Sequence, residues 1–331
     1  MNGKIDVGVI GLGIGEQHIL GYLKENKIDK IYIYDMNKKK ILEILKRYKN
    51  ENIISVENEN EIFDNDTIKV VSVASYDQYH FSQILKSLKN KKNIFCEKPI
   101  CQTETELNKI KNELKRNPEI LISTNTLLRE SPKIQSLKKK FDQNYFGDNF
   151  YMEFDYNYGR LNKLVDGWRG KIKNFSVILS GGIHMIDLIL WFKKAYPKKI
   201  HSFSNNICSN KKTKNTIQDF AISILKFDDN SIIKLCTNFG CIYPHFHRIL
   251  VYGTKKTFEH TFDSSFYLSK NKSGDIKKKN DKKKYPGIKK YALIKNFIDS
   301  VYKKDTLIVS MQEMINSMQL CFDINKSLTQ K

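Results

Sequence analysis

Residues 180–191 read SGGIHMIDLILW, an apolar stretch interrupted by one imidazole and one carboxylate. His184 can exchange a proton near neutral pH, and Asp187, three residues later, would lie on the same face of a helix. Such a pair is either a satisfied group inside a core helix or the chemical centre of an enzyme. Hydrophobic periodicity does not separate these two interpretations, so the rest of the chain has to decide between them.

The composition sets the class of protein. The chain has 331 residues, which is enough for two domains with separate cores. No apolar run approaches the roughly 20 residues that cross a bilayer. The six cysteines are scattered without a CxxC pair, and His245 and His247 lack an evident third ligand. We therefore expect a cytoplasmic protein with free thiols, no metal site and no membrane partner.

The formal net charge of +21 raises the question of nucleic acid binding. The lysines, however, are spread along the whole chain, mostly on the polar faces of amphipathic segments. The densest run, residues 272–290, reads as a low-complexity, solvated loop. The charge pattern therefore favours a lysine-solubilised surface over a nucleic acid partner.

The first part of the chain alternates short β-rich runs with helical periodicity. This pattern predicts a parallel sheet covered by helices, over residues 1–123. Asp77 is expected to cap one of the helices, and Thr103 with Glu106 forms a capping box for another. The expected strands are 4–11, 30–35, 52–56, 68–75, 93–99 and 119–125.

The first strand-to-helix turn reads GLGIGEQH, with glycines at 11, 13 and 15. Glycines there allow a tight turn and a close approach to a pyrophosphate, which the helix N-terminus binds. Asp35 ends the second strand, where a carboxylate accepts hydrogen bonds from a ribose 2′-hydroxyl and repels a 2′-phosphate. The turn therefore predicts NAD(H) in preference to NADP(H). Glu16 occupies the usual place of the third glycine, one position after Gly15.

The hydrophobic pattern changes over residues 124–331, which predicts a second domain. Residues 150–158 alternate strictly between apolar and polar side chains, which is typical of a strand with one packed face. Two hairpins are expected, over 219–239 and 247–262, and a final amphipathic helix over 311–328. Together these elements predict a largely antiparallel sheet of about five or six strands, whose polar face favours oligomerisation.

Four motifs in order, VVSVASYDQYH, IFCEKPI, DGWRG and SGGIHMIDLILW, together with YGTKKTF, resemble the glucose–fructose oxidoreductase/inositol dehydrogenase/MocA family. The resemblance covers the whole chain. It implies an α/β fold with an N-terminal Rossmann domain and a C-terminal α/β domain with an open, largely antiparallel sheet. It also implies hydride transfer between a nicotinamide and a carbon of a sugar, polyol or nucleotide sugar.

Carried onto this sequence, the resemblance makes Lys98 and His184 the catalytic residues and implies a cis Lys98–Pro99 bond. Lys98 also ends a parallel strand, where ligands bind such sheets. Asp187 is expected to support the ring of His184. The expected cofactor contacts are Gly11, Leu12, Gly13, Ile14, Gly15, Asp35, Ser75, His80, Glu97 and Lys98. The expected substrate contacts are Lys98, Asn125, Arg160, Arg169, Ser180 and His184.

Ser180 departs from the family, because many polyol-oxidising relatives have an aspartate there. A neutral hydroxyl argues against an inositol-type substrate, and nucleotide sugars are at least as plausible. Arg160 and Arg169 could bind a phosphate or carboxylate on such a substrate, although a structural salt bridge would also explain each guanidinium. His80 could instead orient a loop, and His18 could simply pack beside the glycine turn. A non-catalytic dinucleotide-binding sensor on the same fold remains the alternative to an enzyme.

Overall fold

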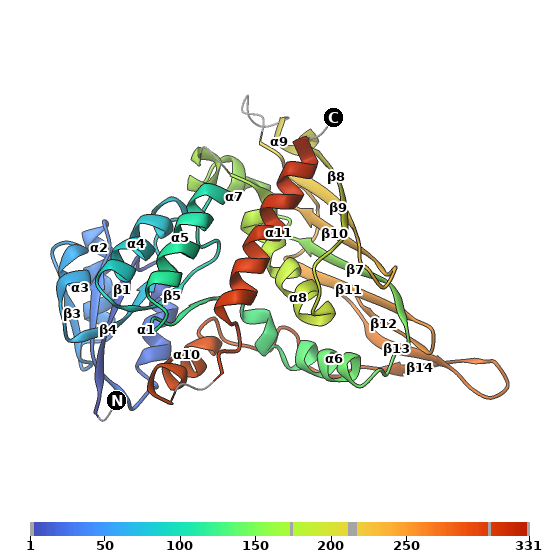
Figure 1. Cartoon of the computed structure of the whole chain (residues 1–331), viewed down its shortest axis with the longest axis horizontal. Helices are drawn as coiled ribbons and strands as arrows, with labels where there is room; N and C mark the ends of the chain where they lie inside the picture. Colours follow the sequence, from blue (N-terminus) through green and yellow to red (C-terminus); the bar gives the residue numbers. More distant parts are fainter. Residues whose placement is uncertain (1–2, 173–174, 211–216, 304–305, 330–331) are drawn as a thin grey trace. The chain divides into compact units, whose positions relative to one another are not determined.

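A computed structural model describes residues 3–172, 175–210, 217–303 and 306–329 (Figure 1). The chain forms two compact units, Met1–Glu130 with Ile288–Ile315, and Ser131–Gly287 with Asn316–Lys331. The expected division into 1–123 and 124–331 has a single crossing, whereas the chain passes between these units three times. None of the described helices is both long and apolar enough to span a membrane.

The first unit is built on a parallel sheet of six strands in the order β3-β2-β1-β4-β5-β6. This is the doubly wound order of dinucleotide-binding domains, and it reverses between β1 and β4. β1 is buried at every position, as expected for a strand covered on both faces. The strands are β1 (Ile5–Ile10), β2 (Ile28–Tyr34), β3 (Ile53–Ser55), β4 (Ile68–Val73), β5 (Asn93–Cys96) and β6 (Ile122–Thr124). The predicted parallel sheet is confirmed.

The helices of this unit are α1 (Gly15–Tyr22), α2 (Lys38–Arg47), α3 (Asn60–Asp64), α4 (Asp77–Lys89), α5 (Glu104–Arg116), η1 (Leu127–Glu130) and α10 (Ala292–Lys303). The Thr103–Glu106 capping box of α5 is confirmed, with both reciprocal hydrogen bonds formed. The predicted cap at Asp77 is wrong. Tyr76 is the N-cap of α4, and Asp77 already lies in the first turn, where its charge complements the helix dipole.

α10 explains why the chain returns to the first unit. Its apolar face is buried, and the ring of Phe297 lies 5.4 Å from that of Phe95 on β5. α10 also lies close to α1, because a Cβ on Gly21 would come within 2.9 Å of Ile294. The sequence analysis did not predict this helix and included its residues in the second domain, because its partners on α1 and β5 lie far earlier in the chain.

The second unit contains an eight-stranded sheet in the order β14-β13-β12-β11-β7-β10-β9-β8, antiparallel except for the pair β7 and β10. Both predicted hairpins are confirmed, but the expected five or six strands become eight. The strands are β7 (Asn149–Asn157), β8 (Lys199–Asn205), β9 (Phe220–Lys226), β10 (Ile232–Asn238), β11 (Phe246–Gly253), β12 (Lys256–His260), β13 (Ser265–Lys270) and β14 (Ile276–Asn280).

The prediction of a solvated loop over 272–290 is wrong in part, since β14 pairs along its length with β13. Every residue of β14 is nevertheless exposed. Three consecutive lysines hide the strand from sequence analysis, because lysine has low β-propensity and shows no apolar alternation. The pairing with β13 outweighs that local preference.

Helices cover one face of this sheet (Figure 1). Phe192 of α8 meets Phe154 of β7 and Phe141 of α6. The helical elements are α6 (Pro132–Asp142), α7 (Leu161–Val165), η2 (Trp168–Lys171), the π-turn η3 (Ile178–Gly182), α8 (Ile183–Lys193), α9 (Ile207–Asn210) and the part of α11 (Met311–Thr329) that follows Asn316. Of the described helices, none covers the opposite face, which we call the outer face.

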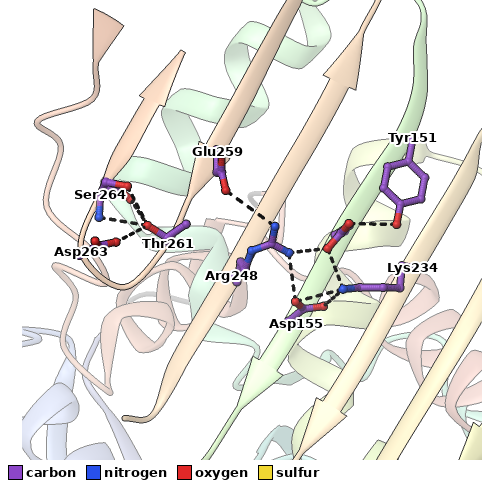
Figure 2. Close-up of polar contacts among 9 residues, drawn as sticks. Tyr151, Asp155, Lys234, Arg248, Glu259, Thr261, Asp263 and Ser264 are labelled. Carbon is purple, nitrogen blue, oxygen red and sulfur yellow. Dashed lines mark hydrogen bonds and ion pairs between the residues drawn. The ribbon is translucent and has the colours of Figure 1, made fainter. Parts of the chain in front are cut away.

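The outer face carries an ion network at its centre (Figure 2). Glu153 and Asp155 of β7 lie between Lys234 of β10 and Arg248 of β11. Lys234 donates to Glu153 at 2.7 Å, and Arg248 also reaches Glu259 at 3.8 Å. The expected polar face of this strand is therefore confirmed. Its acids are, however, largely buried beneath long basic side chains: burial raises the pKa of Asp155 even though both cations oppose that shift.

Candidate active site

The glycine turn after β1 forms as predicted. Gly11 has φ +88°, and a Cβ there would lie 2.5 Å from backbone atoms of Ala74 and Ser75, so only glycine fits. Gly13 is open, because a Cβ would meet nothing nearer than the Lys40 ammonium at 3.9 Å. Gly15 begins α1, and Glu16 turns away to an ion pair with Arg47. The turn is therefore open at Gly13, where a phosphate can approach.

Asp35 is fastened to this turn. Its Oδ2 accepts a hydrogen bond from the Leu12 amide at 2.7 Å, and its Oδ1 accepts one from the Asn37 amide at 2.8 Å. The Lys40 ammonium lies 3.7 Å from Oδ2. Sequence analysis did not anticipate this ion pair; Lys40 belongs to the run KKK at 38–40, which begins three residues after Asp35.

Glu97 is the centre of a buried polar network at the end of β5. Its Oε1 is 2.7 Å from the Asn125 amide nitrogen and 3.2 Å from His18 Nε2. His18 Nδ1 in turn contacts the Ser72 hydroxyl, which also meets Tyr22. Burial alone would raise the pKa of Glu97, but the hydrogen bonds from His18 and Asn125 and the charge of Lys98 hold that pKa at about 2. Glu97 is therefore a buried carboxylate that stays ionised.

Lys98 follows Glu97 and is half-buried. The implied cis Lys98–Pro99 bond is present. The carbonyl of Pro99 lies 2.7 Å from Nδ1 of the buried His80, whose Nε2 lies 3.1 Å from the Ser75 carbonyl. His80 thus joins the loops after β4 and β5, which is the loop-orienting role that sequence analysis left open.

The carboxyl ends of the strands gather the remaining predicted residues of this unit. Gly11 follows β1, Ser75 follows β4, Lys98 follows β5 and Asn125 follows β6. Since neighbouring parallel strands end at one edge of a sheet, these residues share the edge where the strand order reverses. Asn125 donates both to Glu97 and to the Lys290 carbonyl, so its amide nitrogen already has two protein partners.

In the second unit, two glycines set His184 against the sheet. A Cβ on Gly181 would lie 2.5 Å from the Tyr156 ring, and one on Gly182 would lie 2.7 Å from the Thr237 hydroxyl. The chain can therefore bring the junction of η3 and α8 directly onto β7 and β10. Single π-turns of this kind are frequent at functional sites. Ser180 is buried within the turn and Asp187 is buried on α8.

His184 belongs to a group of rings that we call the imidazole cluster, made of Tyr156, His184, His245, His247 and Tyr285. Tyr156 is central: its ring lies 6.1 Å from His184, nearly parallel, and 5.2 Å from both His245 and His247. The Tyr285 hydroxyl lies 2.5 Å from His247 Nδ1. The expected placement of both HFH imidazoles on one strand face is wrong, because β11 begins at Phe246 and His245 precedes it. The two rings are nevertheless 5.0 Å apart. The roles of Tyr156 and Tyr285 had no sequence signal.

The buried imidazoles of this unit are neutral at physiological pH. Burial and the charges of His245 and His260 lower the pKa of His247 to about 3. Burial and the Lys133 ammonium lower the pKa of His260 to about 4. Among the described residues, His247 Nε2 has no hydrogen-bond partner, and neither nitrogen of His260 meets hydrogen-bond geometry.

Arg160 and Arg169 both interact electrostatically with Tyr156. Burial and Tyr158 raise the pKa of Tyr156, while the charges of Arg169 and Arg160 lower it, so both guanidiniums lie within electrostatic reach of the imidazole cluster. Arg160 stacks over Tyr158 at 5.3 Å, and Arg169 over Trp168 at 4.4 Å. In the described part of the chain neither forms an ion pair, which disfavours the salt-bridge interpretation.

A hollow of about 750 Å³ adjoins this region. It is bounded by the segment after β7, including Gly159 and Asn162, and by Gly240–Pro244 before β11. Pro244 directly precedes His245 of the cluster. The residues described by the structure contain no group of three or more side chains suited to a metal ion.

Comparisons with known proteins agree on the family. Residues 5–125 match the family model "Oxidoreductase family, NAD-binding Rossmann fold", and residues 134–259 match "GFO/IDH/MocA C-terminal domain". A curated relative, Oxidoreductase P35 of Formosa agariphila, is 23% identical over 197 residues. That alignment covers 57% of this chain and 60% of the relative, so the match spans less than two thirds of the relative's length.

Solved structures show the same fold at low identity. Myo-inositol 2-dehydrogenase of Lactobacillus plantarum is similar with a TM-score of 0.82 at 17% identity, covering 98% of this chain and 97% of that one. Scyllo-inositol dehydrogenase of Lactobacillus casei, with bound NAD(H) and scyllo-inositol, has a TM-score of 0.80 at 15% identity and the same coverages. UDP-N-acetylglucosamine 3-dehydrogenase of Acidithiobacillus ferrooxidans has a TM-score of 0.80 at 15% identity, covering 98% of each chain.

Proposed function

Because this chain belongs to the GFO/IDH/MocA oxidoreductase family, we propose that it transfers a hydride between C4 of NAD(H) and a carbinol or carbonyl carbon of a sugar derivative. The observation that carries the proposal is Lys98. It is half-buried beside the ionised Glu97, at the sheet edge that also carries the glycine turn. A cation at that edge can polarise a substrate oxygen and stabilise the charge that develops on it.

His184 is proposed to exchange the hydroxyl proton with the substrate. Its ring is set by the glycine-packed η3–α8 junction and by contacts with Tyr156 and His247. The nicotinamide supplies the hydride chemistry when it is bound, while these residues orient the substrate and move the proton. Asp35 and the glycine turn are proposed to hold the adenosine ribose and the pyrophosphate, with a preference for NAD(H).

The substrate is proposed to be a nucleotide sugar or another sugar bearing an anionic group. Arg160 and Arg169 lie within reach of Tyr156 without carboxylate partners among the described residues, and guanidiniums bind phosphates in a bidentate manner. The adjoining hollow, about 750 Å³, is in the size range of small-molecule sites. Ser180 cannot supply the charged acceptor of polyol-oxidising relatives, which further favours this substrate class over inositols.

A substrate screen tests the proposal. Purified full-length protein is incubated with NAD(H) and a set of sugars, polyols and nucleotide sugars, and absorbance of NADH is followed. Lys98→Ala and His184→Ala should lose turnover, whereas the matched controls Lys115→Ala and His201→Ala, both on exposed side chains, should keep it. Equal rates in wild type and both site variants would contradict the assignment. NADH binding without turnover of any compound would favour the non-catalytic sensor.

We also propose a homodimer or homotetramer that forms through the outer face. Phe203 is 71% exposed there, and Ile224 and Ile232 are 37% and 38% exposed. The ion network beside them contains both charge signs, so the same patch on a second copy can be self-complementary. Light scattering after gel filtration should give a multiple of the chain mass, and Phe203→Glu should shift it to the monomer. We further propose a cytoplasmic location, as the scattered cysteine pattern of the sequence suggests.

A further inference from the structure

The hollow beside the imidazole cluster is lined by two cysteines that the proposed function does not use. Cys208 of α9 and Cys241, which follows β10, both contribute to its wall. Both residues are partly exposed, and the other four cysteines of the chain are buried: Cys96, Cys101, Cys236 and Cys321. Partly exposed thiols can react with oxidants, whereas buried structural thiols are inert. The accessible cysteines of the chain are therefore gathered at one cavity.

Asp219 joins the two segments that carry these cysteines. Its buried carboxylate accepts a hydrogen bond from the amide of Ser209, the residue directly after Cys208. Its backbone carbonyl accepts another from the Phe239 amide, just after β10, at 2.8 Å. The segment that carries Cys208 is therefore fastened to the segment that carries Cys241.

Gly240 brings Cys208 close to Cys241. A Cβ on Gly240 would lie 2.7 Å from the Cys208 sulfur and 2.8 Å from the Cys208 Cβ, so glycine is needed for this approach. Cys241 is the next residue, and its amide donates to the Asn238 side chain at 3.0 Å. Because consecutive Cα atoms are about 3.8 Å apart, a rotation of this turn can bring the two cysteines within the roughly 4.4–6.8 Å Cα separation of a disulfide.

We propose that Cys208 and Cys241 are an oxidation site, at which a hydroperoxide converts the two thiols into an intramolecular disulfide across the hollow. The Cys208 sulfur attacks the peroxide, the O–O bond breaks, and a sulfenic acid forms with release of an alcohol, or of water from hydrogen peroxide. The Cys241 sulfur then attacks the sulfenic sulfur, whose oxygen leaves as water with the Cys241 proton. Burial raises the pKa of Cys241, so the first attack is assigned to Cys208.

The disulfide would narrow the hollow, because it would link α9 covalently to the segment before β11. Gly159 and Leu161, on either side of Arg160, line the same hollow. Oxidation is therefore expected to weaken binding of an anionic substrate, and this consequence alone rests on the proposed function. Disulfides in a reducing compartment are usually transient and sense the redox state.

Counting free thiols tests the site without substrate or cofactor. Full-length protein is reduced, freed of reductant and treated with hydrogen peroxide, and the remaining thiols are alkylated and counted by intact mass spectrometry. Wild type should lose two of its six alkylatable thiols and recover both with dithiothreitol. Cys208→Ser and Cys241→Ser should not lose a pair, whereas Cys236→Ala, the control at a buried cysteine, should lose the same two thiols as wild type.

Peptide mapping identifies the bond. Trypsin leaves Cys236 and Cys241 in one peptide, residues 235–248, so the mapping uses Cys236→Ala, in which Cys241 is the only thiol of that peptide. After oxidation this peptide should be linked to residues 200–211, which contain Cys208. Linkage between other cysteines, disulfide-linked dimers, or intact thiols at peroxide concentrations that oxidise glutathione would each overturn the proposal.

Turnover of the substrate found by the screen tests the consequence separately. Peroxide should raise the KM of wild type and dithiothreitol should restore it, whereas Cys208→Ser should respond to neither reagent. A disulfide that forms without a change in KM would overturn the narrowing of the hollow, but not the oxidation site. If no compound is turned over, the proposed function fails, and the thiol count still decides whether the site exists.

Discussion

The two groups of candidate catalytic residues differ in how their buried polar atoms are satisfied. In the first unit, His18, Ser72, Glu97 and Asn125 form a connected network, and the carboxylate at its centre accepts several hydrogen bonds. In the second unit, the buried His247 Nε2 and both ring nitrogens of the buried His260 form no hydrogen bond of good geometry with the described residues. Buried polar groups without partners carry a desolvation cost of about 1–3 kcal/mol each.

This difference indicates that the two groups contribute in different ways to folding and to ligand binding. The hydrogen bonds of the first network are formed in the protein without ligand, and they fix Lys98 and the loops after the strands. The network therefore contributes to the stability of the unliganded fold. The buried imidazoles of the second unit, in contrast, are neutral and keep ring nitrogens that can donate a hydrogen bond to a ligand or accept one from it. A residue in the first network should therefore matter for folding, and one near the imidazole cluster should matter mainly for substrate.

The largest expected effect is on catalysis. Lys98→Ala and His184→Ala should each lower kcat/KM by about 10²- to 10⁴-fold, as expected for the loss of a positioned acid–base or charge-stabilising group. Steady-state kinetics on the substrate found by the screen measures this loss. Unfolding in urea should show that both variants remain folded. A loss confined to one variant would show that only one unit contributes to the chemistry.

The next largest effect should be a decrease in the free energy of unfolding caused by Glu97→Gln. The pKa of Glu97 is held at about 2, below its ordinary 4.5, so the folded state favours the ionised form by roughly 3 kcal/mol. That stabilisation is present above pH 4.5 and is lost as the pH falls through 2. The difference in unfolding free energy between wild type and Glu97→Gln should therefore be full at pH 7 and should narrow below pH 4.5. A difference that does not change with pH would contradict the ionised state of Glu97.

His260→Phe should stabilise the protein at low pH, in contrast to Glu97→Gln, which should destabilise it at neutral pH. It keeps the ring contacts with Phe246 and Tyr285 and removes two nitrogens without hydrogen-bond geometry. The pKa of His260 lies at about 4, below its ordinary 6.5, so the wild type loses stability as pH falls from 6.5 toward 4. Relative to wild type, the variant should be neutral at pH 7.5 and about 2 kcal/mol more stable at pH 5. His201→Phe, on an exposed position of β8, is the control.

The smallest expected effect is on the KM for the substrate. Arg169→Ala should raise KM about tenfold for a substrate with a phosphate or carboxylate group and leave kcat nearly unchanged, since a remote anion contact contributes uniform binding. The effect should weaken with added salt. An unchanged KM would mean that the Arg169 guanidinium only stacks on Trp168 and does not contact the substrate.

The parts that sequence analysis predicted depend on local patterns. The six strands of the first sheet, the glycine turn and the Thr103 capping box each occupy a short, continuous segment, where side-chain periodicity and turn chemistry act directly. The fold class followed from these segments taken together. The motifs that located Lys98 and His184 are equally local, and both residues lie where the motifs imply, at the end of β5 and the start of α8.

What could not be predicted depends on distant pairing. The parallel pairing of β7 and β10 joins residues about 80 positions apart, and the return of α10 to the first unit spans an even longer separation. Tyr285 reaches His247 across 38 residues of chain. No local rule gives such a contact. The ion pair between Lys40 and Asp35 was missed for another reason, because one lysine in a run of three is distinguished only by the direction in which α2 turns it.

One further consequence follows from β14, the outermost strand of the eight-stranded sheet. Its free backbone edge could template the strand of another molecule, as unprotected edges do in fibrous aggregates. Lys277, Lys278 and Lys279 occupy that edge in succession, and all three are exposed. Two such edges would repel one another on approach. The sheet can therefore meet a second copy through its face while the growth of endless ribbons along its rim is blocked.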